Sequence, residues 1–281
     1  MAARDAEYRE RWVPTAPGVT LRLREWTPRR ETAPPLVLVP GWISGIASWT
    51  EVLEAVVPHR RVVVVETRDK PSARLDGRLR VREMGIPAFA RDLVAAVEAS
   101  GAAGPETVAF GSSLGATAIL EAMKGGGLPV GGAFLVAPNA RFRTPLWARP
   151  LLLLPPAVYR AARHLAVLYI LRFRLDPRKE PEQAARYRRA ILEAEPRRLM
   201  VSARALADYT VWDGLETVTR PVAVAWASTD RLHEANDIRR IIEILPDPHP
   251  VPCPSNRFMH SAGIVPHLER FEADAIRHAR V

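Results

Sequence analysis

The sequence predicts an α/β protein built on a doubly wound, mostly parallel sheet, and three patterns lead to this fold class. Short, continuous apolar runs over 36–39 and 62–65 are typical of strands that are buried on both faces, as in parallel sheets. Apolar residues at helical spacing follow these runs, which is the alternation expected of βαβ units. Residues 141–216 break this rhythm with long helical patterns, several prolines and no convincing strand. We therefore expect a helical insertion between two strands of the sheet.

The expected elements follow in order along the chain. Leu21 and Leu23 alternate with arginines, as in a strand with one buried face. Ile46 and Trp49 begin a helical pattern that continues to Val56. The further expected elements are a helix through Phe89, Leu93, Ala96 and Val97, strands over 133–137 and 222–226, and a closing helix through Ile264, Leu268, Phe271 and Ala275.

Three prolines mark the last strand as an edge strand. Pro250, Pro252 and Pro254 alternate, so all three remove a backbone N–H on the same side of an extended segment. Only a strand at the edge of a sheet readily tolerates such a loss. The alternation therefore places this segment at one end of the predicted sheet.

Composition sets the broad class of the protein. The chain has 281 residues, of which 48% are apolar and 25% are charged, which is ordinary for a soluble globular protein. Cys253 is the single cysteine, so neither an internal disulfide nor a cysteine metal cluster can form. The first dozen residues mix both charge signs, and the longest apolar stretch, 150–171, is broken by prolines and basic residues. We expect neither a secretory signal nor a membrane-spanning helix, and hence a cytoplasmic protein.

The most informative stretch is 107–123, where a strand-forming run, a sharp turn and a helix-forming run follow one another. The turn, Gly111-Ser112-Ser113-Leu114-Gly115, has the G-x-S-x-G pattern of a nucleophile elbow, and only Ser113 has glycine two residues away on both sides. Such a turn strains the serine backbone and presents its hydroxyl at the carboxyl end of the sheet. The same pattern also occurs in tight strand–helix connections without chemistry, so the rest of the chain has to decide.

Four features in order give the chain a resemblance to a known superfamily. They are the Val39-Pro40-Gly41-Trp42 turn after an apolar strand, the elbow at Ser113, Asp230 closing a strand, and His260 just after the last strand. With these features, over nearly its whole length, the chain resembles the α/β hydrolases. Among them it is most similar to the members with a serine nucleophile and a helical cap between the sixth and seventh strands.

The resemblance implies a role for each of these residues. Ser113 would be the nucleophile, Asp230 the acid that orients the imidazole, and His260 the general base, in the family's chain order of Ser, Asp or Glu, His. The backbone N–H groups of Trp42 and Leu114 would form the oxyanion hole. Acyl transfer through a serine requires no cofactor and no metal.

The activity that the resemblance implies is hydrolysis of a carboxylic ester or thioester with a hydrophobic acyl group, through an acyl-enzyme. A carbon–carbon bond hydrolase uses the same triad and the same capped fold, and stays open as an alternative. A catalytically silent binding protein of this fold is the second alternative, although a binding scaffold has no need of all three groups.

Some assignments have competing interpretations. Asp230 could instead cap the helix that follows it. His233 is the nearest rival of His260 as the base, but it lies three residues after the acid, in a loop expected to point away from the edge strand. His249 is expected before the last strand, at the wrong end of the sheet. The other histidines precede the acid (His59, His164) or lie on the closing helix (His267, His278).

Two segments depart from the family pattern. Pro40-Gly41 stands where relatives often have His-Gly, but the expected donor is a backbone group and is not removed. Glu66-Thr67-Arg68-Asp69-Lys70 stands where many relatives continue with an Asp, Arg, Gly run. That run is usually structural, so we expect its loss to leave the triad untouched.

The resemblance further implies a hydrolase core of residues 1–140 and 217–281, with a helical cap of residues 141–216 over the active site. The formal net charge is +9, and 15 basic against 5 acidic residues between 141 and 204 account for the whole excess. Apolar and arginine side chains in this segment favour a hydrophobic acyl substrate with a negative group nearby, or peripheral contact with an anionic membrane. A solvated helical face rich in arginine is the alternative. Nucleic-acid binding is not expected, because no recognised module accompanies the charge.

Overall fold

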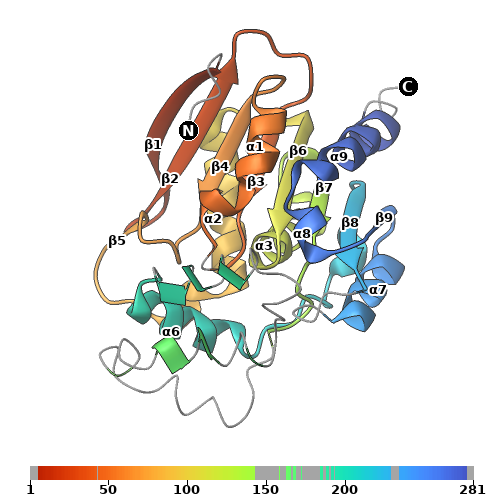
Figure 1. Ribbon diagram of the computed structural model, residues 1–281. Helices are drawn as coiled ribbons and strands as arrows, with labels where there is room; N and C mark the ends of the chain where they lie inside the picture. The colour runs from red at the N-terminus through yellow and green to blue at the C-terminus, as the bar shows by residue number, and fades with distance from the viewer. Residues whose placement is uncertain are drawn as a thin grey trace.

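The computed structural model has one sheet, which contains nine strands within the part of the chain that the structure describes (Figure 1). Its order is β1-β2-β4-β3-β6-β7-β8-β9, and β5 pairs with β2. The described residues are 6–42, 44–142, 158, 163–165, 167–168, 172, 184–185, 188–189, 191–192, 194–228 and 234–276. The strands are β1 Ala6–Ala16, β2 Val19–Pro28, β3 Leu36–Val39, β4 Val62–Glu66, β5 Arg74–Leu75, β6 Gly104–Ser112, β7 Val130–Val136, β8 Val222–Ala227 and β9 Pro248–Cys253.

The strand pairing confirms the predicted fold class. All neighbouring strands from β4 across to β9 are parallel. The chain starts the parallel part at β3, adds β4 on one side, and then crosses back to add β6 on the other. The apolar runs predicted as strands, β3 and β4, are buried at every position, because helices cover both faces of the sheet.

The sequence predicts only half of the antiparallel hairpin at one edge. β2 is the strand expected around Leu21, but β1 pairs with it along nearly its whole length and was not predicted. Gly18 makes the turn between them with a φ of 68°, a conformation that glycine adopts without strain. Tyr8 of β1 packs on Trp26 of β2, with ring centroids 4.9 Å apart. The hairpin therefore stabilises a strand with only one buried residue, Val13.

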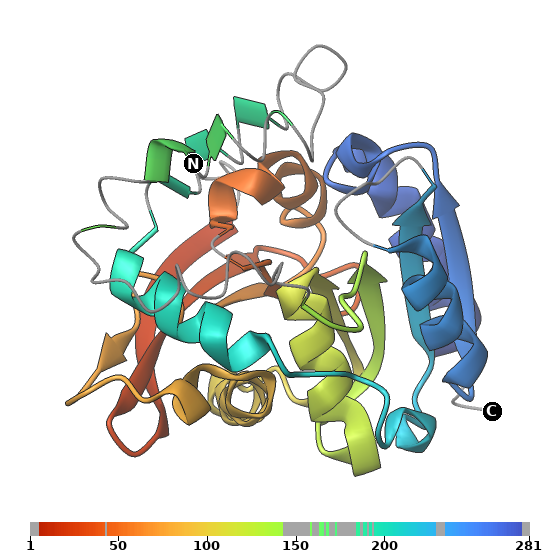
Figure 2. The same ribbon diagram turned by 90° about the horizontal axis from the view of Figure 1, so that it is seen from below.

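Helices cover both faces of the sheet (Figure 2). α1 and α9 lie on one face, and α2 and α3 lie together on the other. α2 has Pro87 in its first turn and ends at Gly101, whose φ of 70° suits a left-handed cap. The helices are α1 Thr50–Val56, α2 Ile86–Ser100, α3 Leu114–Met123, α6 Pro196–Leu206, α7 Ala235–Ile244, α8 Asn256–Met259 and α9 Val265–Phe271.

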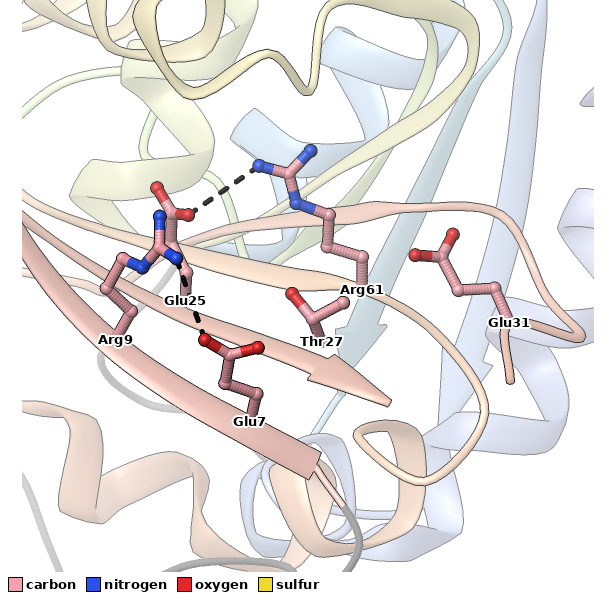
Figure 3. Close-up of a pocket in the computed structure, with 6 residues that line it drawn as sticks. All are labelled: Glu7, Arg9, Glu25, Thr27, Glu31 and Arg61. Atoms are coloured by element: carbon pink, nitrogen blue, oxygen red, sulfur yellow. Dashed lines mark ion pairs between the residues drawn. The ribbon is translucent and has the colours of Figure 1, made fainter. Parts of the chain in front are cut away.

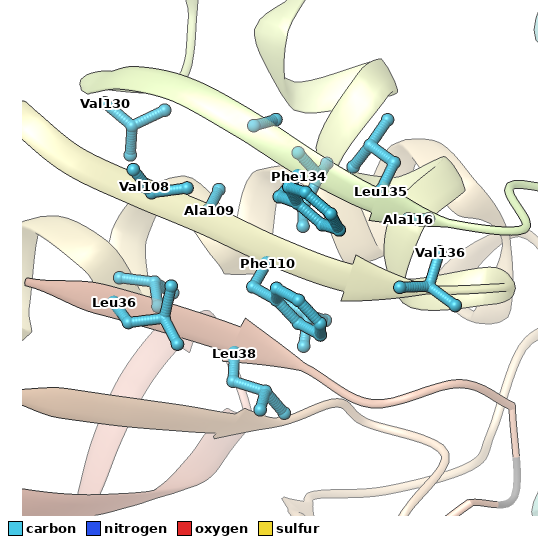
Figure 4. Close-up of a cluster of buried hydrophobic side chains, with 14 of the residues drawn as sticks. Leu36, Leu38, Val108, Ala109, Phe110, Ala116, Val130, Phe134, Leu135 and Val136 are labelled. Atoms are coloured by element: carbon cyan, nitrogen blue, oxygen red, sulfur yellow. The ribbon is translucent and has the colours of Figure 1, made fainter. Parts of the chain in front are cut away.

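The core is centred on β3, β6 and β7 (Figure 4). Phe110 of β6 and Phe134 of β7 stack with their ring centroids 5.5 Å apart and their planes 2° from parallel. Leu36 and Leu38 of β3 belong to the same cluster and are fully buried, as is Ala116 of α3. This packing fixes three neighbouring strands relative to one another, and the loops after these strands carry the candidate site.

β9 is the strand at the second edge, as the alternating prolines predict. Pro250 and Pro252 lie within it, and Pro254 follows its end. His249 was expected before this strand and is instead its second residue, because pairing with Ala223 extends the strand towards its amino end. It still lies at the end of the sheet away from the candidate site.

Most of the insertion at 141–216 lies outside the described residues, so the division into core and cap stays a prediction. An isolated antiparallel bridge joins Arg141 to Thr210, which brings the two ends of the insertion together. The described helix α6 lies below the ends of the central strands in Figure 1. The indole Nε1 of Trp42, after β3, donates to Oγ of Ser202 in α6 at 3.0 Å. This hydrogen bond attaches the last helix of the insertion to a loop of the sheet.

Candidate active site

Ser113 lies at a sharp turn between β6 and α3, as predicted. Its φ of 51° and ψ of −116° are a combination that residues other than glycine rarely adopt. The backbone N–H of Ser113 donates to the carbonyl oxygen of Val136 at 2.9 Å, which ties the turn to β7. The sharp strand–helix turn is confirmed, together with the backbone strain expected at its apex.

The two glycines around Ser113 allow strand and helix to cross closely. A Cβ on Gly111 would lie 2.5 Å from Cδ1 of Ile119 and 2.8 Å from the nitrogen of Ala116, both in α3. A Cβ on Gly115 would lie 2.2 Å from the carbonyl oxygen of Val39, at the end of β3. Neither position has room for a side chain, which is the physical reason for glycine on both sides of the serine.

The hydroxyl of Ser113 donates to Oδ1 of Asn139, at 2.6 Å. Asn139 follows β7, just after Ala137, whose φ of 46° is also strained. The Thr117 hydroxyl fixes the loop, since it donates to the carbonyl oxygen of Asn139 at 2.9 Å and accepts from its N–H at 3.0 Å. The sequence analysis missed Asn139. Its place just beyond a parallel strand, at the same edge as Ser113, is the signal that could have found it.

His260 reaches the same turn from the other end of the sheet, although it follows Ser112 by 148 positions in the chain. Its Nε2 lies 3.4 Å from Oγ of Ser112, and its Nδ1 lies 3.0 Å from the carbonyl oxygen of Asn256. Because a carbonyl oxygen only accepts, the second contact assigns a proton to Nδ1 and leaves Nε2 as an acceptor. The structure therefore brings the predicted histidine to the turn that contains Ser113, where its Nε2 contacts the neighbouring Ser112. The pairing of His260 with Ser113 itself stays a prediction.

A short helix and an indole ring hold His260. The sequence predicts a loop before it, but residues 256–259 form α8, because the Ser255 hydroxyl caps this turn by accepting the N–H of Phe258 at 3.1 Å. The buried ring of Trp49 packs on the imidazole, with centroids 4.6 Å apart and planes 33° from parallel. The ring contact holds the imidazole at the side of the turn.

The turn after β3 lies beside Ser113. A Cβ on Gly41 would lie 3.4 Å from Cβ of Ser113, so the Gly41–Trp42 peptide borders the serine. Leu114 is the first residue of α3, and no side chain caps this end of the helix. The positive end of the helix dipole therefore adjoins the turn. Trp42 follows Gly41 and Leu114 follows Ser113, so both backbone N–H groups belong to segments next to the turn, and their role as oxyanion donors stays a prediction.

A second apolar cluster joins the insertion to the core next to this turn. Tyr209, which follows α6, donates to Oε2 of Glu121 at 2.8 Å. Burial, and then the Glu121 charge, raise the pKa of Tyr209, so the phenol stays protonated. The cluster consists of Ile86, Phe89, Leu114, Ala118 and Leu206, with Trp42, Phe142 and Tyr209 packed against it.

No protein-family model matches the sequence, and no curated protein matches it. Solved structures of other proteins match its fold over nearly the whole chain. An esterase from Thermogutta terrifontis is 18% identical with a TM-score of 0.72, over 95% of this chain and 99% of its own. An enol-lactonase from Burkholderia xenovorans is 16% identical with a TM-score of 0.72, over 93% and 96%. An α/β hydrolase from Sphaerobacter thermophilus is 20% identical with a TM-score of 0.70, over 93% and 99%.

This chain has the α/β-hydrolase fold. At these identities the likeness is one of fold. In open α/β sheets, ligands bind outside the carboxyl ends of the strands, where the strand order reverses. In this α/β-hydrolase fold that reversal lies between β3 and β6, which is where Trp42 and Ser113 meet.

The predicted acid cannot be placed in this site. Asp230 lies outside the described residues, and so does His233, the rival of His260 as the general base. β8 ends at Ala227, three residues before Asp230, and points to the same edge of the sheet as β6. The role of Asp230 therefore stays a prediction.

A hollow of about 250 Å³ lies elsewhere, on the hairpin of β1 and β2 (Figure 3). Arg9 and Glu7 form an ion pair across it at 3.6 Å, and so do Arg61 and Glu25, also at 3.6 Å. Its charges thus pair with each other, and it shares no residue with the elbow. The lining residues are Glu7, Arg9, Glu25, Thr27, Glu31 and Arg61.

Two further classes of site were sought among the described residues. In this part of the chain, no three His, Cys, Asp or Glu side chains are grouped so that they could hold a metal ion. Within the same residues, none of the helices combines the length and the apolar character that crossing a bilayer demands.

Proposed function

We propose that this protein is a serine hydrolase that cleaves a carboxylic ester or thioester with a hydrophobic acyl group. The observation that carries the proposal is the strained backbone of Ser113 at a turn that His260 also reaches. Such strain costs about 1–3 kcal/mol and clusters at functional sites. Two of the similar structures are named an esterase and an enol-lactonase, which supports ester-type bonds as the substrate class.

The reaction we infer begins with Ser113. As its oxygen attacks the carbonyl carbon of the substrate, its proton passes to Nε2 of His260. The imidazolium then gives this proton to the leaving alcohol or thiol, and an acyl-enzyme remains on Ser113. Water attacks the acyl group, again losing its proton to His260, which releases the acid and restores the serine. In the resting structure the Ser113 hydroxyl donates a hydrogen bond to Oδ1 of Asn139, so it has to turn from Asn139 to Nε2 of His260 before its proton can pass.

Negative charge develops on the carbonyl oxygen of the substrate, and we assign its stabilisation to two backbone donors. These are the N–H groups of Trp42 and Leu114, which lie on either side of Ser113. Loss of one such donor typically lowers kcat by about 10²–10³-fold. Leu114 adds the dipole of α3 at the same position.

We assign Asp230 the role of the acid that holds the imidazole of His260 in its working orientation. The support is its place beyond β8, beside the strand that leads to Asn139. Asp230→Asn should lower kcat by up to about 10⁴-fold with little effect on KM. A fall in kcat of less than about tenfold would show that Asp230 is not the acid of the triad.

The insertion should select the substrate. Leu165 and Leu168 are 68% and 62% exposed, which supports a hydrophobic acyl group or contact with a membrane. The arginines around them, Arg160 and Arg174 among others, lie outside the described residues. Cosedimentation with anionic and neutral liposomes tests the membrane version, which predicts stronger retention on anionic ones. Equal partitioning would exclude the membrane contact, and the hydrophobic acyl substrate would be the remaining interpretation.

Labelling with a fluorophosphonate probe tests the proposal directly. The wild type and Ser112→Ala should label, whereas Ser113→Ala should not, and hydrolysis of a series of chromogenic esters and acyl-thioesters should follow the labelling. Ser112→Ala is the matched control, because Ser112 is the last residue of β6, is 5% exposed and carries a hydroxyl 3.4 Å from Nε2 of His260. If labelling is lost in Ser112→Ala and kept in Ser113→Ala, the nucleophile is Ser112 and not Ser113. An unlabelled wild type would favour a binding protein.

A further inference from the structure

We propose that Lys70 is a positioning residue for the oxyanion hole, because its buried ammonium holds the Gly41–Trp42 peptide with the Trp42 N–H turned towards Ser113. The inference rests on the proposed function, since it concerns the donor assigned there. It gives a use to Asp69 and Lys70, which belong to the segment after β4 that departs from the family pattern.

The contacts of Lys70 define the arrangement. Its Nζ donates to the carbonyl oxygen of Gly41 at 2.9 Å and to Oδ2 of Asp69 at 2.6 Å. The side chains of Lys70 and Asp69 are only 6% and 1% exposed. The Thr67 hydroxyl donates to the other carboxylate oxygen of Asp69 at 2.5 Å, which fixes the carboxylate from behind. The ammonium is therefore held at one place behind the turn after β3.

Because of the geometry of a peptide, the contact of Lys70 with the Gly41 carbonyl determines where the Trp42 N–H points. A trans peptide is planar, and its C=O and N–H point in opposite directions. The described residues contain no cis peptide bond, so the carbonyl of Gly41 and the N–H of Trp42 point in opposite directions within their shared plane. Lys70 holds the carbonyl, and Gly41 borders the side chain of Ser113. The N–H of Trp42 is thereby turned away from Lys70 and can meet the carbonyl oxygen of a substrate bound at the serine.

Charge adds to direction. A cation on the carbonyl oxygen polarises the amide and makes its N–H a stronger donor, and the effect is larger in a buried, low-dielectric place. The N–H of Ser44 also donates to the carbonyl oxygen of Gly41, at 3.2 Å, so the turn keeps one hold when Lys70 is removed. Losing Lys70 should therefore cost part of one oxyanion donor rather than all of it.

Stability alone does not explain the Lys70–Asp69 pair. Taking two charges out of water is costly, and well-packed apolar residues usually stabilise a fold at least as well as a buried ion pair. Arg198 of α6 donates to the carbonyl oxygens of Lys70 and Ala73, so the backbone of this segment has a hold that does not depend on the ammonium. The position of the charge, directly behind the candidate donor, is what the ion pair adds.

The test compares kcat, KM and the affinity for a trifluoromethyl ketone, which forms a tetrahedral adduct with the serine. Lys70→Met should lower kcat by about 10- to 100-fold, a part of the loss typical for one oxyanion donor. It should leave KM within about twofold and weaken trifluoromethyl ketone binding by the same factor as kcat. A merely structural role would not separate kcat from KM in this way.

Two variants keep the result interpretable. Asp69→Asn combined with Lys70→Met removes both charges, so it tests the same point if Lys70→Met alone does not fold. Arg68→Met is the matched control, because Arg68 is equally buried and donates to Asp92 of α2 at 2.6 Å and to the carbonyl oxygen of Glu83, and neither of these groups belongs to the Gly41 turn. It should lose stability and keep kcat within about twofold. If a folded Lys70 variant keeps kcat and trifluoromethyl ketone affinity within twofold of the wild type, while hydrolysis still depends on Ser113, the inference about Lys70 is wrong. If hydrolysis does not depend on Ser113, the proposed function itself fails.

Discussion

Gly115→Ala tests the packing on which the whole site depends. The added Cβ would lie 2.2 Å from the carbonyl oxygen of Val39 and 2.7 Å from that of Pro40. Carbon and oxygen normally approach to about 3.3–3.6 Å, so the shorter contact is about 1 Å too close. Both oxygens belong to backbone at the end of β3, which cannot rotate away as a flexible side chain would. Overpacking of this kind costs about 1–3 kcal/mol, and we expect the upper end of that range.

In the same variant, kcat should fall even under conditions where the protein is fully folded, so the loss of activity is not explained by unfolding. To admit the Cβ, the end of β3 has to move away from α3, and it carries with it the Gly41–Trp42 peptide. Urea unfolding gives the loss in free energy of unfolding, and ester hydrolysis under conditions where the variant is folded gives the loss in kcat. We expect kcat to fall at least tenfold in the folded protein, since one oxyanion donor is displaced.

Gly45→Ala is the control for this experiment. Gly45 follows the same turn, has an ordinary φ of −99°, and a Cβ there would meet nothing within 4 Å. It should change the free energy of unfolding by less than about 0.5 kcal/mol. If Gly115→Ala is as stable and as active as Gly45→Ala, then the close approach of α3 to the end of β3 is not what shapes the site.

Three further predictions follow from other parts of the fold. Arg60 and Glu272 form an ion pair with side chains only 1% and 2% exposed, so Arg60→Met should cost about 3–5 kcal/mol in urea unfolding, and a loss under 1 kcal/mol would contradict the burial argument. Burial raises the pKa of Cys253 to about 11 from an ordinary 9.0, so a thiolate-selective reagent should label native protein at pH 8 far more slowly than unfolded protein, and equal rates would refute this. For the same reason, the unfolded thiol ionises first as the pH rises from about 9 to 11, and Cys253 should lower stability in that window, which melting curves of Cys253→Ala against the wild type would reveal. Replacing Pro250 and Pro252 by valine should restore backbone donors on the edge strand β9 and increase light scattering on storage, whereas unchanged scattering would mean that the prolines do not protect this edge.

The sequence was sufficient wherever local pattern decides structure. Continuous apolar runs predict β3 and β4, and glycines at fixed spacing predict the elbow at Ser113. β1 could not be found in this way, because charged residues interrupt its apolar ones and it becomes a strand only by pairing with β2. Local propensity says little when a distant partner supplies the hydrogen bonds.

The residues of the candidate site also fall into those that local pattern predicts and those that only distant contacts reveal. The sequence predicts Ser113 and His260 because chain order and residue type constrain them, and their catalytic roles stay predictions. Asn139 and Lys70 were not, since each matters through a hydrogen bond to a residue that is distant in the chain. Such contacts are properties of the folded loops, and no spacing rule in the sequence encodes them.

The attachment of α6 has a consequence for how the proposed hydrolase could be re-engineered. Ser202 holds the Trp42 ring, and Arg198 holds the backbone of Lys70, so this one helix touches both segments that shape the turn beside Ser113. Grafting a new lid onto this scaffold to accept another substrate should therefore keep α6 and exchange only what precedes it. A graft that replaces α6 as well would alter turnover together with selectivity, and the two effects could not be tuned apart.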